Sequence, residues 1–272
     1  MNRWTRTRVI TLLVLSLIAA AALWRAWLLS RPPLVPLGGY RLAARLKGTG
    51  SPPLVFEAGF EDAMKLFAPL QEAMAEHTET LVYDRAGYGR SDPGPQPRTA
   101  VAVATDLRGL LAALGIRPPV VLVCYGAGCL FTRVFAHEYP SEVAGLVFID
   151  PATEATYAAQ VHRAPEKDWP AGARREWASL PATLEEARSA WPLPSVPSLV
   201  VTAMKPSGRW PFESRSDMSA WLKEQQSLLG RLGDATHIVF PQATHTSVLA
   251  EKDVQKSILE LIARAKLQIF SG

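Results

Sequence analysis

Residues 121–131, "VLVCYGAGCLF", run from an apolar, strand-like segment through a turn of small residues into a helix-like segment. A strand that passes sharply into a helix displays the residue at the tip of the turn. Its neighbours must be small, because the backbone is crowded there. The tip of this turn is Gly126, which has no reactive side chain. The stretch therefore predicts a turn shaped to display a side chain, at a position that carries none.

Apolar runs alternate with helix-like segments along the rest of the chain. The runs that predict strands are "PLVFEAG", "TLVYD", "VVLV", "AGLVFID", "SLVVTA" and "HIVF". Apolar residues recur at helical spacing over residues 62–77, 99–114 and 252–266. Strands that are apolar throughout and alternate with helices predict an α/β fold, with a mostly parallel sheet covered by helices on both faces. In such sheets the functional residues lie beyond the carboxyl ends of the strands.

Length and composition indicate one large globular domain with an apolar addition. The chain has 272 residues, of which 48% are hydrophobic and 20% charged, and its formal net charge is +4. Its Lys and Arg residues are scattered and form no basic stripe, so we expect no nucleic-acid partner. The sequence contains no phosphate loop, dinucleotide fingerprint or metal-ligand spacing, so we expect no cofactor and no metal.

Two cysteines, Cys124 and Cys129, lie on either side of the turn. Two residues cannot build a disulfide framework, and a buried cysteine is usually a small, inert hydrophobe. We therefore expect both to behave as buried hydrophobic residues that say little about the redox compartment.

The N-terminal region is strongly apolar. Residues 9–29 contain few polar side chains and follow Arg3, Arg6 and Arg8, and about 20 apolar residues suffice for a helix that crosses a bilayer. A cleaved signal peptide is the alternative, but the apolar run resumes after Arg25, which favours an uncleaved transmembrane helix. We expect residues 1–30 to anchor the protein in a membrane and residues 31–272 to form the domain. Arginines before the segment favour an extracytoplasmic domain, although others follow it closely.

Residues from about 152 to 194 interrupt the alternation of strands and helices. They carry Trp169, Trp177 and Trp191 among many charged residues. We expect this insertion to form a short helical lid.

Several longer stretches carry a family resemblance. They are "GTGSPPLVFEAGF", "YDRAGYGRSDPGPQPRTA", "RVFAHEYPSEVAGLVFIDPA" and the histidine of "QATHTSVL". From about Gly39 to its end, the chain resembles an α/β-hydrolase of the bacterial esterase-like kind, which implies that fold and an ester or related acyl hydrolysis. The family's turn reads glycine, any residue, serine, any residue, glycine. This chain has Cys124 in place of the first glycine and Gly126 in place of the serine, and it keeps Gly128.

The resemblance also implies the other catalytic groups. His245 follows the last predicted strand, where the family places its general base, and an imidazole can accept and return a proton near neutral pH. A carboxylate should fix the tautomer of this histidine. No acid directly follows "SLVVTA", so Asp150 at the end of "AGLVFID" is the candidate, with Asp217 and Glu213 as alternatives. We interpret the other four histidines as structural.

The resemblance further implies an oxyanion hole made of backbone N–H groups. One belongs to Ala127, which follows the nucleophile position, and the other to Phe60, in the loop after "EAG". Backbone donors need no particular side chain, so this part of the site can survive the loss of the serine.

Gly126 cannot form a bond to a substrate, so an acyl-enzyme needs another nucleophile. We therefore predict a membrane-anchored member of the family whose serine-dependent catalysis is lost or strongly weakened. Cys124 and Cys129 are poor substitutes for the serine, and water activated by His245 is a better one. Two alternatives remain open. One is a non-acyl, lyase-like reaction that uses His245 and Asp150, and the other is a non-catalytic scaffold or pocket that binds a small apolar or ester-like molecule.

Overall fold

A computed structural model of the protein describes residues 12, 15–22, 24–25, 31–158, 161–162, 164–165, 167–207 and 215–271. The chain divides into two units, Met1–Pro33 and Leu34–Gly272. In the first unit, residues 12, 15–22 and 24–25 are helical. The other residues of the predicted membrane segment, 9–29, lie outside the described residues. Among the residues described, no helix combines the length and apolar character needed to cross a bilayer.

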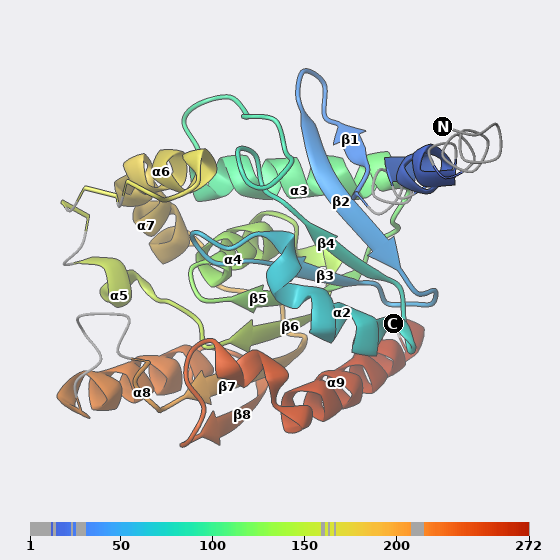
Figure 1. Cartoon of the computed structure of the whole chain (residues 1–272). Helices are drawn as coiled ribbons and strands as arrows, with labels where there is room; N and C mark the ends of the chain where they lie inside the picture. Colours follow the sequence, from blue (N-terminus) through green and yellow to red (C-terminus); the bar gives the residue numbers. More distant parts are fainter. Residues whose placement is uncertain are drawn as a thin grey trace, which may run out of the picture. The chain divides into compact units, whose positions relative to one another are not determined.

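The second unit is built on an eight-stranded sheet with the order β1-β2-β4-β3-β5-β6-β7-β8 (Figure 1). Its strands are β1 (Leu34–Pro36), β2 (Arg41–Lys47), β3 (Leu54–Glu57), β4 (Thr80–Tyr83), β5 (Val120–Tyr125), β6 (Val143–Ile149), β7 (Pro197–Ala203) and β8 (Asp234–Phe240). β2 runs antiparallel to both β1 and β4, and the remaining pairs are parallel. Strands β3 to β7 are buried along their whole length, as their unbroken apolar runs predict.

Helices cover both faces of this sheet, which confirms the predicted architecture (Figure 1). The helices are α2 (Ala68–Ala75), α3 (Ala100–Leu114), α4 (Gly128–Glu138), α8 (Arg215–Leu229) and α9 (Lys252–Ser271), with short 3-10 turns η1 (Met64–Phe67), η2 (Pro140–Glu142) and η3 (Ser247–Ala250). Apolar side chains of α3 and α4 form one core with one face of the sheet, and those of α2 and α9 form a second core with the other face. At the start of α3, Thr99 accepts a hydrogen bond from the Ala102 N–H and so caps the helix.

In the described part of the segment predicted as a lid, about 152–194, lie the short helices α5 (Glu154–Ala158), α6 (Ala171–Ala178) and α7 (Leu180–Ser189). Trp169 and Trp177 of this segment are buried, and their rings meet at 5.0 Å. Trp177 also contacts Phe60, at 5.8 Å between ring centroids. These edge-to-face contacts hold the insertion against the core that includes α3 and α4.

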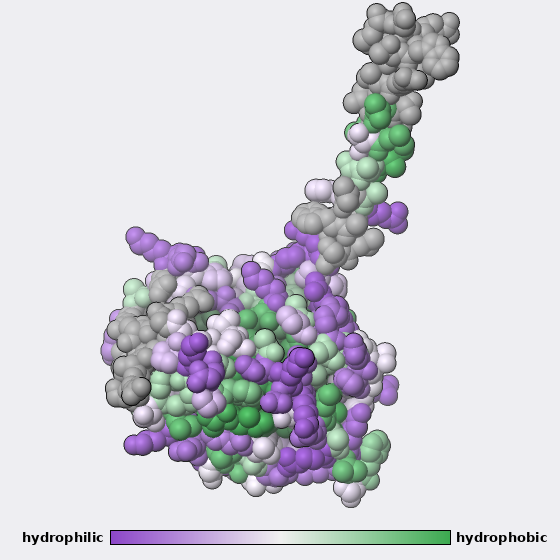
Figure 2. All heavy atoms as spheres, turned by 60° about the horizontal axis from the view of Figure 1, so that its bottom comes forward, coloured by the Kyte–Doolittle hydropathy of each residue, from purple (hydrophilic) through white to green (hydrophobic). Residues whose placement is uncertain are grey.

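Figure 2 turns the lower part of Figure 1 toward the viewer. On the domain, hydrophilic residues surround this face and hydrophobic residues lie in patches between them. One hydrophobic side chain of the edge strand β8, that of Val239, is 38% exposed.

A buried arginine joins three elements at the carboxyl edge of the sheet. The Arg85 guanidinium, in the loop after β4, donates to the Glu57 carboxylate at 2.8 Å and to both carboxylate oxygens of Glu176 at 2.8 and 2.9 Å. It also donates to the carbonyls of Ala58 and Gly59 at 2.6 and 2.9 Å. Burial raises the pKa of Glu57, and the nearby guanidinium opposes that rise. Because Glu57 ends β3 and Glu176 lies in α6, this one cation ties the sheet to the insertion.

One tight contact between α4 and β3 gives a stability prediction. A Cβ added to Gly128 would lie 2.4 Å from the carbonyl oxygen of Ala58 and 2.5 Å from that of Glu57. These are backbone atoms, so the helix would have to move, and we expect Gly128→Ala to lower the free energy of unfolding by about 1–3 kcal/mol. Chemical denaturation of the purified domain measures this.

The matched control is Gly109→Ala, in an exposed position of α3. Its added Cβ would meet only a Leu37 methyl group, at 3.5 Å. Because alanine favours a helix interior, we expect this variant to gain up to about 1 kcal/mol. Equal changes in the free energy of unfolding for the two variants would contradict the close approach of Gly128 to the Ala58 and Glu57 carbonyls.

A second prediction concerns pH. His237 lies within β8, and its Nε2 atom is 2.8 Å from Thr202 Oγ1 on β7. Burial lowers the pKa of His237, so the unfolded chain binds this proton more readily than the folded domain does. Protonation of His237 therefore does not affect stability above a pH of about 6.5, the pKa of histidine in an unfolded chain. Below that value the unfolded chain takes up the proton first, so stability falls as pH falls. We expect His237→Gln to make the loss of stability between pH 7 and 5 shallower, which urea titrations at several pH values test; an unchanged slope would contradict this.

Candidate functional site

The residues predicted for the site come from four strand ends and meet at one edge of the sheet. Phe60 follows β3, Gly126 follows β5, Asp150 follows β6 and His245 follows β8. Tyr125 is paired with Ile149 in the register of β5 and β6, so Gly126 and Asp150 emerge side by side. The parallel topology is therefore what brings these distant positions together.

Asp150 and His245 form a hydrogen-bonded pair. The Nδ1 atom of His245 lies 2.5 Å from Oδ2 of Asp150, whose other oxygen accepts from the Ala203 N–H at 2.9 Å and from Trp221 Nε1 at 3.1 Å. A carboxylate only accepts, so Nδ1 carries the proton and Nε2 is left free to take one. Asp150 adopts a left-handed backbone conformation, with φ at +46°, and is 3% exposed.

The two alternative acids are placed differently. Asp217 lies in the first turn of α8, and Glu213 falls outside the described residues. The carboxylate at Nδ1 of His245 is that of Asp150. Trp221, which helps to orient this carboxylate, carries no sequence signal for such a role.

Gly126 faces the imidazole directly. An ideal Cβ at this position would lie 3.2 Å from Nε2 of His245 and 3.3 Å from Cε1. The turn places Gly126 in the left-handed region, with φ at +53°, and its N–H donates to the Ile149 carbonyl at 3.2 Å. Its own carbonyl accepts from the N–H groups of Ala152, at 3.0 Å, and Cys129, at 3.2 Å. Position 126 thus occupies the place of a nucleophile without supplying one.

The two predicted oxyanion donors line the same cavity as Gly126 and His245. In the described part of the chain, no backbone acceptor takes the N–H of Phe60 or of Ala127. Two carbonyls just before Phe60 are held by the buried Arg85, which therefore fixes the path of this loop. The arrangement leaves both N–H groups available to a ligand oxygen.

The cavity between these groups is small. Its volume is about 80 Å³, and it is lined by Gly59, Phe60, Glu61, Asp62, Leu66, Tyr125, Gly126, Ala127, Tyr157, His245 and Thr246. The Tyr125 ring stacks on the imidazole at 4.3 Å between centroids. Tyr157 of α5 contacts Phe60 edge to face at 5.5 Å, so the insertion closes one side of the cavity. Since a water molecule takes up about 30 Å³ in the liquid, the space suits a small acyl group or a few waters.

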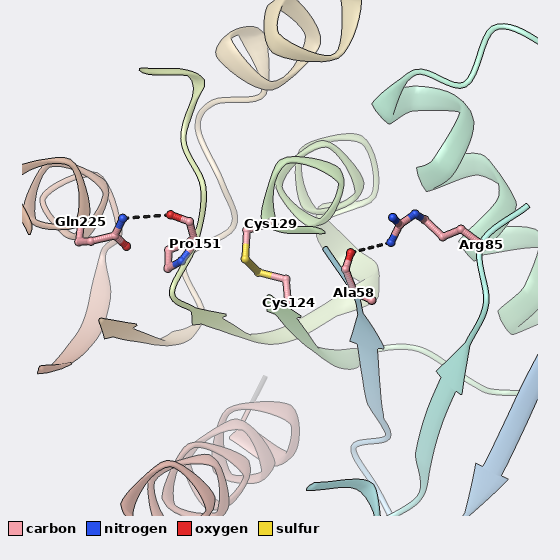
Figure 3. The surroundings of a disulfide bond; sticks show 6 residues. All are labelled: Ala58, Arg85, Cys124, Cys129, Pro151 and Gln225. Atoms are coloured by element: carbon pink, nitrogen blue, oxygen red, sulfur yellow. Dashed lines mark hydrogen bonds between the residues drawn. A yellow bond between two sulfur atoms is a disulfide. The ribbon is translucent and has the colours of Figure 1, made fainter. Parts of the chain in front are cut away.

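The expectation for the cysteines is wrong in one respect. Cys124 and Cys129 are buried, at 0% and 1% exposure, but they are joined to each other in a disulfide (Figure 3). The sharp turn folds the first residues of α4 back over the end of β5, and this brings the two Cα atoms to 5.0 Å, within the range for a bridge. Neither cysteine therefore offers a thiol to replace the missing serine.

The remaining histidines lie elsewhere. His137 contacts the Pro192 carbonyl at 3.2 Å, His237 contacts Thr202, and neither lines the cavity. Within the described residues, no group of three or more His, Cys, Asp or Glu side chains is placed to hold a metal ion.

Known proteins resemble parts of this chain. "Probable transporter efuK" of Hormonema carpetanum is 33% identical over 145 residues, which are 50% of this chain and 21% of that protein. The 2-(acetamidomethylene)succinate hydrolase of Mesorhizobium japonicum is 31% identical over 116 residues, which are 43% of this chain and 41% of the enzyme. The chain thus spans less than half the length of these curated relatives.

A solved structure, the enol-lactonase of Burkholderia xenovorans LB400, has the same fold. It aligns with a TM-score of 0.67 and 16% identity, over 85% of this chain and 100% of the enzyme. The family described as the α/β hydrolase fold matches residues 52–200, more than half of the chain, and this match includes the strands that lead to Phe60, Gly126 and Asp150. This chain therefore belongs to the α/β-hydrolase fold family.

Proposed function

We propose that this protein is a membrane-anchored α/β-hydrolase-family protein that does not form a serine acyl-enzyme. The observation that carries the proposal is the absence of a side chain at Gly126, where an added Cβ would lie 3.2 Å from Nε2 of His245. Both cysteines are held in a disulfide. In the part of the chain that the structure describes, the hydroxyl-bearing residues that line the cavity are Tyr125, Tyr157 and Thr246. The Tyr125 hydroxyl donates to the backbone carbonyl of His245 at 3.1 Å, and no hydrogen bond joins Tyr157 or Thr246 to Nε2. Among these residues, no hydroxyl or thiol stands ready in place of the nucleophile.

The site keeps the groups that move protons and hold a negative oxygen. His245, oriented by Asp150, can accept a proton at Nε2 from a water molecule in the cavity. That water attacks a carbonyl carbon while the carbonyl oxygen, now negatively charged, lies against the N–H groups of Phe60 and Ala127. When the tetrahedral intermediate collapses, the bond from the carbonyl carbon to the ester oxygen breaks, and the protonated Nε2 returns its proton to the departing alcohol. A triad enzyme that has lost one member keeps a rate about 10³–10⁴ above the uncatalysed reaction, so we propose weak hydrolysis of a small ester or related acyl compound.

The similarity to 2-(acetamidomethylene)succinate hydrolase supports a carbonyl compound as the ligand. The same pair of side chains would also serve a proton transfer without hydrolysis, because that step needs only the free Nε2 atom.

Binding without catalysis is the second candidate. Part of the cavity wall is aromatic, from Phe60, Tyr125 and Tyr157, and neither a serine nor a cysteine stands among the described residues that line it, although Glu61 and Asp62 do. Such walls suit a small apolar or ester-like molecule. Native mass spectrometry of the purified protein tests this candidate, since a bound small molecule would add a defined mass that His245→Trp, which fills the cavity, removes.

The disulfide also bears on location. Thiols stay reduced in most cytosolic proteins, whereas disulfides persist in oxidising compartments. The Cys124–Cys129 bridge therefore supports an extracytoplasmic domain. The arginines before the apolar segment 9–29 support the same orientation, with the N-terminus inside.

Gly126→Ser tests whether the nucleophile is the missing part. The native protein should not react with a fluorophosphonate probe, because the probe requires an activated serine. The variant should be labelled, although the imidazole must first shift by a few tenths of an ångström to admit the new Cβ atom. Gel fluorescence after labelling measures both.

Two controls complete this experiment. Gly126→Ala adds the same Cβ without a hydroxyl and should remain unlabelled, and Gly126→Ser with His245→Ala should lose the label. Strong labelling of the native protein would refute the proposal.

A second prediction separates weak catalysis from binding alone. If His245 is the general base, His245→Ala should lower the hydrolysis rate of short-chain p-nitrophenyl esters by about 10²–10⁴-fold. His237→Ala, outside the cavity, should leave the rate unchanged. Equal rates for the native protein and His245→Ala would leave ligand binding as the function.

A further inference from the structure

The disulfide encloses the part of the chain on which the site depends. Between Cys124 and Cys129 lie Gly126, which faces the imidazole, and Ala127, which lines the cavity. Figure 3 shows the bridge between the end of β5 and the start of α4, with the Ala58–Arg85 hydrogen bond on one side and the Pro151–Gln225 hydrogen bond on the other. The bridge is thus built into the turn itself, rather than linking two distant parts of the fold.

The bridge is also inaccessible to thiols in solution. Both cysteines are buried, at 0% and 1% exposure, within the core formed by the sheet with α3 and α4. A disulfide that solvent thiols cannot reach does not exchange readily, because exchange requires attack by a thiolate on sulfur. A redox-catalytic role is therefore a poor explanation for its position.

The turn has a reason to need a covalent restraint. Gly126 has no side chain, and a glycine is freer in its backbone than any other residue. Besides the bridge, its peptide groups are held by three hydrogen bonds, and two of these are 3.2 Å long, at the upper end of the usual range. A short covalent loop restricts the same backbone angles that glycine leaves free.

We propose that the Cys124–Cys129 disulfide is a positioning element of the site. It holds the turn so that Gly126 stays beside His245 and Ala127 stays in the wall of the cavity, although no side chain at position 126 helps to define these positions. The proposal rests on the proposed function only in taking Ala127 as a ligand-binding donor. A bridge that serves stability alone would act on the unfolded chain and leave the folded turn unchanged.

The first experiment establishes the bridge. Purified full-length protein is denatured and treated with iodoacetamide, with and without prior reduction by dithiothreitol. Intact mass should show no alkylated cysteine before reduction and two after it. Two alkylated cysteines before reduction would overturn the proposal.

The second experiment measures the turn in the folded state. In Cys124→Ala/Cys129→Ala, amide hydrogen exchange at positions 129 and 130, whose N–H groups bond to the carbonyls of Gly126 and Ala127, should become at least about 10-fold faster than the loss of global stability accounts for. The control is Leu110→Ala, a buried residue of α3, which lowers stability without touching the turn. Exchange that follows global stability equally in both variants would overturn the proposal. Cys124→Val/Cys129→Ala, which fills more of the space, replaces the first variant if that one does not fold.

The third experiment reads out the geometry of the site. Gly126→Ser is compared with Gly126→Ser/Cys124→Ala/Cys129→Ala for the rate of fluorophosphonate labelling. We expect labelling to be at least about 10-fold slower without the bridge, and unchanged when Leu110→Ala is added instead. Equal rates with and without the bridge would overturn the positioning role and leave the proposed function intact. If Gly126→Ser is not labelled at all, the serine is not the only missing part of the site, the proposed function is decided by the His245→Ala comparison, and the exchange measurement alone decides the role of the bridge.

Discussion

The buried guanidinium of Arg85 is the interaction on which the arrangement of the site depends. A cation enclosed in protein must be neutralised and fully hydrogen-bonded, and Glu57, Glu176 and two backbone carbonyls meet that demand. These partners come from three separate places, which are the end of β3, the helix α6 of the insertion, and the loop before Phe60. The hydrogen bonds and ion pairs of Arg85 therefore fix the sheet, the insertion and the loop that carries the Phe60 N–H relative to one another.

Around that fixed frame, the absence of a side chain at position 126 leaves the neighbouring groups of the site in place. Asp150 still holds the imidazole of His245, and the backbone donors still line the cavity, because these groups depend on strand ends and on backbone rather than on the side chain at position 126. The missing side chain at position 126 leaves no wide gap. The imidazole lies so close to the Gly126 backbone that even one added carbon atom would be crowded. The site is thus best described as a preserved proton acceptor beside a small cavity.

The sequence predicted those features that follow from the order of strands and helices. Unbroken apolar runs revealed the buried parallel strands, and a strand end is where Gly126, Asp150 and His245 were expected to lie. Features that depend on how the chain folds back were missed. The disulfide joins two residues only five positions apart, and nothing in their spacing shows that α4 returns over the end of β5. Arg85 lies in a polar loop, so its complete burial between two carboxylates could not be inferred, and Trp221 reaches Asp150 from a helix 71 residues along the chain.

The close approach of α4 to β3 bears on how this turn can change over evolutionary time. At position 128 any side chain would collide with main-chain oxygens, which cannot rotate aside, whereas position 126 faces a ring that can tilt and position 124 already accommodates sulfur. Position 126 is also restricted by its left-handed φ, but there the obstacle is a movable ring, whereas at position 128 it is fixed main chain. In distant descendants of a hydrolase ancestor, the surviving glycine would be the last recognisable trace of the turn, long after both the reactive residue and its preceding glycine had been replaced.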